Sequence, residues 1–261
     1  MELWLLNRFS TVALTLLVVG GFVALAVLGS LLAYRRHPAL ATGEHNEMVG
    51  VVLGMFGAIY GIILAFVIVN LWTQLEGTMS VVATEATSAS QIVRDARAFP
   101  PEHQAAVDAA VKGYVHSVVE VQWPLMREGR GDFSRTAEHV EAMYAALRGF
   151  EPQSQSEQVF YQEAVDSLND VVAQRRSRIA DSKLSLPPLL WLLVIGGALV
   201  ILPLTFIYGI RNRRIRLLFV GSVAGLIGFS LLLVLVLDRP FAGDLCVSPQ
   251  PFKQSELARF W

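Results

Sequence analysis

Four long blocks of apolar residues, each free of formal charge, alternate with polar segments along the chain. They run from Phe9 to Tyr34, from Met48 to Leu75, from Leu184 to Ile210 and from Leu217 to Leu237. A helix needs about 20 apolar residues to cross the hydrocarbon core of a bilayer. The pattern therefore predicts four transmembrane helices. The first block also precedes Ala39-Leu40-Ala41, which resembles a signal cleavage site, but its apolar run is too long for a signal peptide and we interpret it as a retained helix.

The second block contains four glycines that share one face of the expected helix. Gly50, Gly54, Gly57 and Gly61 are spaced i, i+4, i+7 and i+11, which places them on one side of an α-helix. Small residues let helix backbones approach closely in lipid, although glycine is also common in membrane helices generally. Two G-x-x-x-G pairs in register favour a packed interface. The partner is either another helix of the chain or the same helix of a second copy.

Three polar or aromatic residues of the second block need a partner or a polar surrounding. Asn70 and Thr73 lie near its C-terminal end, and in an oligomer they could form a polar ring in a pore. Alternatively, Asn70 bonds a neighbouring helix or lies at the membrane interface. Tyr60 lies well inside the span, so we expect its hydroxyl to face protein.

Helical patterns fill the segment between the second and third blocks. We expect the second transmembrane helix to continue into water until just before Pro100, followed by helices over 101–126 and from Ser134 to Leu147. Ser154 and Glu157 form a capping-box pattern, which opens a last helix that continues toward the third span. The fold class is thus an all-α membrane protein with an inserted helical bundle, in which the second and third transmembrane helices extend beyond the membrane. The expected divisions are residues 1–75, 76–183, 184–237 and 238–261.

Composition excludes several classes of function. The mean hydropathy is +0.49 and the net charge is −1, so nothing indicates a nucleic-acid partner. The single cysteine, Cys246, cannot form an internal disulfide, and no His/Cys cluster has zinc spacing. No catalytic motif is present, so we expect no catalytic residue, no metal and no cofactor.

The cores of the four spans lack Asp, Glu, Lys, Arg and His. Pumps and ion-coupled transporters usually carry such residues within the membrane, so active transport is not expected. A passive pore and a non-conducting scaffold or sensor both remain. In the second case the bundle 76–183, with a net charge of −5, would be the docking or receiving domain for a protein partner that the sequence does not identify.

Four spans place both termini and the bundle on one side of the membrane. The loops 35–47 and 211–216 lie on the other side and carry six arginines, so the positive-inside rule assigns them to the cytoplasm and the bundle to the periplasm. A basic cluster on the bundle side nearly cancels this bias. It consists of Arg175, Arg176, Arg178 and Lys183, which would either supply positive potential at a pore mouth or contact lipid phosphates.

Several segments together resemble a bacterial family of four-span membrane proteins labelled bestrophin-like. They include the run from Tyr60 to Trp72, Glu85-Ala86-Thr87, Arg175-Arg176-Ser177-Arg178 and Leu237-Asp238-Arg239-Pro240-Phe241. The resemblance covers about residues 45–252 and depends on the order and spacing of the segments. It implies a bacterial inner-membrane location, but the family brings no established activity.

The label compares the family with bestrophins, which are oligomeric anion channels with four spans per subunit. By that analogy we expect a homo-oligomer in the lipid bilayer that conducts anions passively. The chain departs from bestrophins in its tail, where Asp238 and Asp244 stand in place of an acidic calcium clasp. Bestrophins also place their helical domain in the cytosol, whereas the loop arginines here indicate the opposite side.

Overall fold

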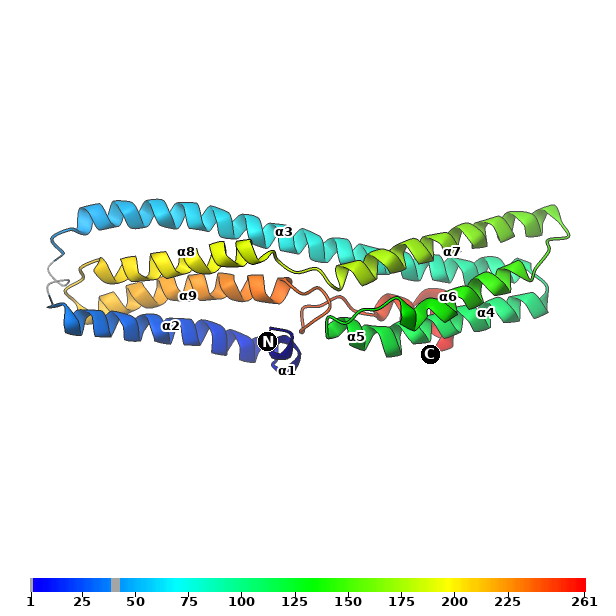
Figure 1. The fold of residues 1–261 in the computed structure, drawn as a ribbon, viewed down its shortest axis with the longest axis horizontal. Coiled ribbons are helices and arrows are strands. Elements are labelled where there is room, and N and C mark those ends of the chain that lie inside the picture. The colour runs from blue at the N-terminus through cyan, green and yellow to red at the C-terminus, as the bar shows by residue number, and fades with distance from the viewer. Residues whose placement is uncertain (1, 39–42) are drawn as a thin grey trace. The chain divides into compact units, whose positions relative to one another are not determined.

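The computed structural model describes residues 2–38 and 43–261, which form helices and no strand (Figure 1). The cleavage-like Ala39-Leu40-Ala41 lies outside the described residues. The α-helices are α1 (Glu2–Arg8), α2 (Thr11–Arg36), α3 (Asn46–Asp95), α4 (Pro101–His116), α5 (Trp123–Arg127), α6 (Ser134–Arg148), α7 (Gln155–Asp181), α8 (Pro188–Ile207) and α9 (Arg213–Leu237). The 3-10 segments are η2 (Ala96–Ala98), η4 (Gln250–Lys253) and η5 (Ser255–Phe260), and η3 (Ser117–Gln122) is a π-helix.

Four of the described helices are long and apolar enough to cross a membrane, which confirms the predicted all-α, four-span class. They are α2, α3, α8 and α9. Only 11 % of the most apolar stretch of α2 is buried, compared with 50 % of that of α9. Most of the apolar surface of these helices therefore faces lipid or another protein chain, because exposing so much of it to water would be costly.

The chain divides into two compact units. Unit 1 contains the chain up to Thr73, Ser185–Asp238 and Gly243–Leu245. Unit 2 contains Gln74–Leu184, Arg239–Ala242 and Cys246–Trp261. Helix α3 contributes to both, since it continues without a break past Glu76, as the absence of proline there predicts. The segment after Leu237, treated above as a separate tail, belongs mostly to unit 2.

Helices α2 and α9 pack side by side in unit 1 through small residues. Ala26 of α2 and Ala224 of α9 are buried in a shared apolar cluster with Val220. At Gly228 of α9, an added Cβ would lie 3.1 Å from Cβ of Phe22. Gly228 of the fourth span thus holds the two helices at a distance that a larger residue would not permit.

Tyr60 of α3 packs on α8 at a glycine, which confirms that this side chain faces protein. Its hydroxyl donates a hydrogen bond to the carbonyl oxygen of Val194 at 2.8 Å. Its ring covers Gly197 so closely that an added Cβ there would overlap the ring atoms, whereas a Cβ on the preceding Gly196 would meet nothing within 4 Å.

Two acidic residues that follow α9 in the chain, Asp238 and Asp244, hold helix ends within unit 1. The buried Asp238 carboxylate accepts a hydrogen bond from the backbone N–H of Leu186, just before α8. The Asp244 carboxylate accepts from the backbone N–H of Thr11 at 2.7 Å, at the first turn of α2. Both carboxylates thus bind free N–H groups near helix starts, where negative charge is favourable.

In unit 2 the predicted capping box opens α7. The Ser154 hydroxyl accepts from the backbone N–H of Glu157, and the Glu157 carboxylate accepts from the backbone N–H of Ser154. The expected extension of the third span is wrong, because α7 ends at Asp181 and α8 begins only at Pro188. The consecutive prolines Pro187 and Pro188 explain the break, since helical geometry is disfavoured for the residue before a proline and proline has no backbone N–H to donate.

The end of the chain packs onto the helices of unit 2. Phe252 and Leu257 are buried, and the Trp123 ring meets the Phe252 ring edge-on at 6.3 Å between centroids. Ion pairs join Arg97 to Glu256 and Arg259 to Asp108. Residues 246–261 therefore contribute buried side chains to the core of this unit.

The contact between Tyr60 and Gly197 gives a first prediction. Gly197→Ala should lower the free energy of unfolding by about 1–3 kcal/mol, because the new methyl group forces the Tyr60 ring away from α8. Thermal unfolding of the purified protein in detergent measures the change. Gly196→Ala is the matched control, since it adds the same methyl group in open space and should leave the midpoint unchanged or slightly higher. Equal effects of the two substitutions would contradict the packing argument.

Candidate functional site

The glycine face of α3 is largely unused by the chain itself. A Cβ added to Gly54, Gly57 or Gly61 would meet no described atom within 4 Å, and one added to Gly50 would only touch the Tyr208 ring at 3.5 Å. The close partner suggested by the G-x-x-x-G pairs is thus not supplied by the described helices of the same chain. Three of the four glycines instead leave a shallow, smooth surface that remains open.

Two of these glycines line an apolar groove in unit 1. The groove has a volume of about 380 Å³ and is bounded by α3, α8 and α9, with Gly57, Gly61 and Ala65 on one wall and Ile201 and Ile227 opposite. The hydroxyl groups of two further lining residues, Tyr60 and Ser230, donate to the carbonyl oxygens of Val194 and Leu226. The lining therefore offers no charged group and suits apolar side chains or lipid tails.

Asn70 and Thr73 lie away from the glycines. Both are exposed on α3, and the nine positions between Gly61 and Asn70 correspond to a rotation of about 180°. The Thr73 hydroxyl donates to the carbonyl oxygen of Val69 in its own helix at 3.0 Å. A single surface of α3 cannot carry both the glycines and these polar residues, so they belong to two different faces.

The face of α3 opposite its buried side carries a row of large apolar residues. Ile59, Ile62 and Phe66 are 55 %, 70 % and 77 % exposed. Buried residues on the other side, Leu64, Val67 and Leu71, hold the helix against the rest of unit 1. Thr73 and Asn70 continue the exposed row toward the end of the span. This row, like the open glycine face, is part of the surface that α3 presents to its surroundings.

The expected basic cluster is only partly on the surface. Arg176 and Lys183 are exposed, but Arg175 and Arg178 are buried in unit 2. The prediction that all four face a pore mouth or lipid phosphates is therefore wrong for Arg175 and Arg178. The reason is helical geometry: residues 175 and 178 lie one turn apart on the inward side of α7, whereas residue 176 is rotated by about 100° toward solvent.

Arg178 forms a buried ion pair with Glu85 of α3. Its Nε and Nη2 atoms donate to the two carboxylate oxygens at 2.6 and 3.0 Å, and both side chains are fully buried. Nη2 also donates to the amide oxygen of Gln122 at 2.8 Å, and the Tyr114 hydroxyl donates to Glu85 at 2.5 Å. Four elements, α3, α4, η3 and α7, meet at this pair, and the carboxylate accepts its three hydrogen bonds from the buried side chains of Arg178 and Tyr114.

Burial and charge fix the protonation states in this network. Burial, together with the Glu85 charge, raises the pKa of Tyr114 well above its ordinary value of 10.0, so the phenol stays a neutral donor. Burial alone would lower the pKa of Arg178, but the charge and hydrogen bonds of Glu85 outweigh it and raise the pKa. The arrangement is a structural ion pair and offers no group poised for proton transfer.

Arg175 extends the network toward the loop before α6. Its Nε donates to the Thr136 hydroxyl at 2.6 Å and its Nη2 to the carbonyl oxygen of Phe133 at 2.5 Å. Sequence spacing gave no signal for these pairs, because Glu85 and Arg178 are 93 positions apart. Glu85 and Arg178 do lie in segments that carry the family resemblance, and this resemblance is the sequence signal that points to them.

The described residues contain no group of three His, Cys, Asp or Glu side chains that could hold a metal ion. His116 is the histidine with the most contacts: its Nε2 lies 2.8 Å from the carbonyl oxygen of Phe260, and its ring stacks on Trp261. These contacts attach the end of the chain to α4.

Comparison with known proteins identifies the family. A family model of the Bestrophin-like domain matches residues 20–252, and the chain belongs to this family. A comparison with curated proteins finds no significant match. The chain is therefore an integral membrane protein of the bestrophin-like family, and no catalytic family is indicated.

Solved structures share the fold at low sequence identity. The crystal structure of a mutant bacterial bestrophin homologue from Klebsiella pneumoniae is 14 % identical, with a TM-score of 0.66, over 93 % of this chain and 98 % of that chain. A second mutant of a Klebsiella pneumoniae homologue is 13 % identical, with a TM-score of 0.60, over 93 % and 97 %. A mutant described as a membrane protein gives the same values as the second. The structural similarity covers nearly the whole of each chain, and it shows a shared fold.

The buried ion pair gives a second prediction. Arg178→Met should lower the free energy of unfolding by about 3–5 kcal/mol, because it leaves the Glu85 carboxylate buried without its partner. Circular dichroism during thermal unfolding in detergent measures the loss. Arg176→Met, which removes an exposed arginine from the same helix, should change stability by less than about 0.5 kcal/mol.

A double variant tests the reason for that loss. Adding Glu85→Gln to Arg178→Met removes the orphaned charge and should recover part of the stability. If the double variant is less stable than Arg178→Met alone, the unpaired carboxylate is not the cause.

Proposed function

We propose that the protein is a homo-oligomeric pore through which anions pass passively, lined by α3 of each copy. The observation that carries the proposal is the exposed row Ile59, Ile62 and Phe66, which lies opposite the side by which α3 packs in its own unit. A helix that buries one side and presents large side chains on the other suits the inner wall of a ring of subunits. Membership of the bestrophin-like family and the fold shared with the Klebsiella homologues support this assignment.

The composition of the row suggests how a pore would work. Ile62 and Phe66 form an apolar constriction, and such constrictions gate by excluding water. Beyond them, Asn70 and Thr73 supply an amide and a hydroxyl group, whose N–H and O–H donate hydrogen bonds to an anion. No carboxylate lies on α3 between Glu47 and Glu76, so nothing in the span repels negative charge. The absence of titratable groups suits passive flow.

The glycine face then serves assembly. Gly54, Gly57 and Gly61 are open in the single chain, and the adjoining groove of about 380 Å³ is apolar. In a ring, this side of α3 is turned toward a neighbouring copy, whose apolar side chains fill the groove. Smooth glycine surfaces permit such close contact in lipid. In this proposal one face of α3 lines the ion path, and another face forms the interface between neighbouring copies.

Chloride flux into liposomes that contain the purified protein tests the pore. Phe66→Ala should increase flux because it widens the apolar constriction, and replacement of Asn70 with Leu should reduce it because an anion loses a donor. The control is Leu16→Ala, which shortens an equally exposed apolar side chain on α2. No chloride flux from a correctly inserted oligomer would contradict the proposal and would favour the scaffold or sensor, with residues 76–183 as the docking domain.

Mass measurement in mild detergent tests the assembly. Gly57→Leu should shift the protein toward monomers, because the larger side chain occupies the groove that a neighbouring copy would fill. Ala58→Leu is the matched control, since it places the same side chain about 100° around the helix. A wild-type protein that is monomeric under all conditions would contradict the ring.

A further inference from the structure

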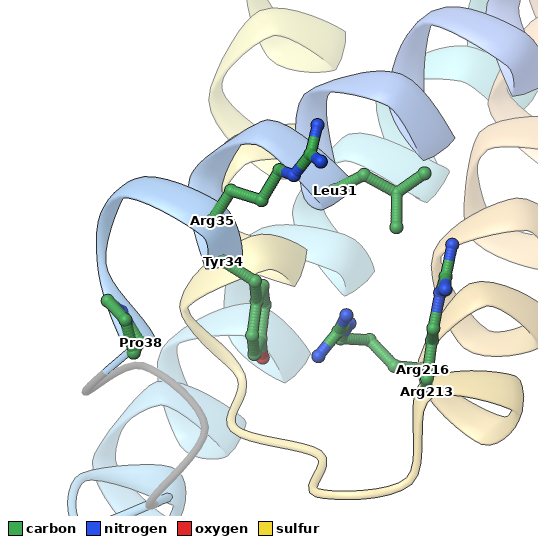
Figure 2. Close-up of a pocket in the computed structure, with 6 residues that line it drawn as sticks. All are labelled: Leu31, Tyr34, Arg35, Pro38, Arg213 and Arg216. Carbon is green, nitrogen blue, oxygen red and sulfur yellow. The ribbon is translucent and has the colours of Figure 1, made fainter.

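A second cavity of unit 1 lies where α2 ends and α9 begins. It has a volume of about 520 Å³ and is lined by Leu31, Tyr34, Arg35, Pro38, Arg213 and Arg216. Figure 2 shows that the basic side chains come from two helices, Arg35 from α2 and Arg213 with Arg216 from α9. Three of the six lining residues are therefore arginines, and none is acidic.

Arg216 is the unusual member of this set. It is only 7 % exposed, and its Cζ atom lies 3.6 Å from the centre of the Tyr34 ring. Figure 2 shows its side chain extending from α9 toward that ring. The ring is held in place by its hydroxyl, which donates to the carbonyl oxygen of Tyr208 at 2.8 Å. The cation is thus fixed in position by an aromatic face.

The Nε atom of Arg216 lacks the acceptor that a buried donor normally has. This atom is buried and has no hydrogen-bond partner in the part of the chain that the structure describes. A buried donor without an acceptor is costly, and native proteins rarely keep one without a ligand or solvent to satisfy it. The observation points to an acceptor that comes from outside the chain and enters the cavity.

The other two arginines are also uncompensated. Arg35 and Arg213 are exposed at the cavity, and no ion pair among the described residues involves either of them or Arg216. The cavity therefore concentrates three positive charges around one space. Guanidinium groups match the geometry of phosphate oxygens, to which they donate paired hydrogen bonds.

We propose that this cavity binds a phosphate ester, with Arg216 as the buried donor and Arg35 and Arg213 as flanking donors. The cavity lies at the ends of two apolar helices, and Leu31 forms part of its wall. Basic pockets between transmembrane helices are typical sites for the headgroups of anionic lipids. The same chemistry accepts the phosphate of a small soluble ester, and the experiment separates the two sources.

The test uses the full-length protein in nanodiscs of phosphatidylcholine, with or without phosphatidylglycerol, and counts bound phosphatidylglycerol by native mass spectrometry. The variant carries Arg35→Gln and Arg213→Gln, both at exposed positions that folding should tolerate. The matched control carries Arg36→Gln and Arg214→Gln, which remove the same charge from exposed neighbours that do not line the cavity. A parallel arm adds glycerol 3-phosphate to protein in phosphatidylcholine alone.

The unaltered protein should retain phosphatidylglycerol, and the Arg35/Arg213 variant should bind it about ten-fold more weakly or worse, while the control remains close to the unaltered protein. Glycerol 3-phosphate that binds without the anionic lipid, with the same dependence on Arg35 and Arg213, would also support the site and would identify a soluble ester as its source. Equal loss in the variant and the control would overturn the proposal, as would failure of both probes to bind.

Discussion

The ion pair between Glu85 and Arg178 is the interaction on which unit 2 depends. Two opposite charges without any solvent contact are stable only when every donor and acceptor around them is satisfied. That requirement fixes the positions of Tyr114, Gln122 and Met126, whose Sδ lies 3.3 Å from Nη1 of Arg178. Residues from five elements, α3, α4, η3, α5 and α7, must therefore be in place at once. Such an all-or-none arrangement gives specificity to a helical bundle whose apolar contacts alone would tolerate several alignments.

The helices of unit 1 are held together differently, because in lipid the burial of apolar surface does little to drive their association. Its contacts depend on glycine and on a few hydrogen bonds. Gly228 lets α9 approach α2, Gly197 accommodates the Tyr60 ring, and Asp238 and Asp244 bind free N–H groups at helix starts. The glycines packed within unit 1 lie mainly on α2, α8 and α9, while Gly54, Gly57 and Gly61 of α3 stay open. The distinction separates the glycines used for internal packing from the glycine face for which we propose a role in assembly.

Much of the fold could be predicted from the sequence, because the signals are local. Uncharged blocks identify membrane helices, and Ser154 with Glu157 marks a helix start. Pro187 with Pro188 marks the break before α8, which the expectation of an extended third span does not take into account. The sites depend on contacts between distant segments, and these could not be predicted. Arg175 and Arg178 looked like surface charges because nothing local reveals that Glu85 lies opposite Arg178. Likewise, Arg216 gave no sign that it stacks on Tyr34, 182 positions earlier in the chain.

The π-helix η3 makes the network in unit 2 depend on how the backbone winds. From Ser117 to Gln122 the chain winds more widely than an α-helix, and this turns the Gln122 side chain inward to Arg178. An α-helix advances about 100° per residue. A regular α-helix over the same residues would therefore turn Gln122 and Trp123 away from their partners, although every side chain of the network would still be present. A mutational survey that only exchanges the side chains of the network would overlook this dependence on backbone geometry.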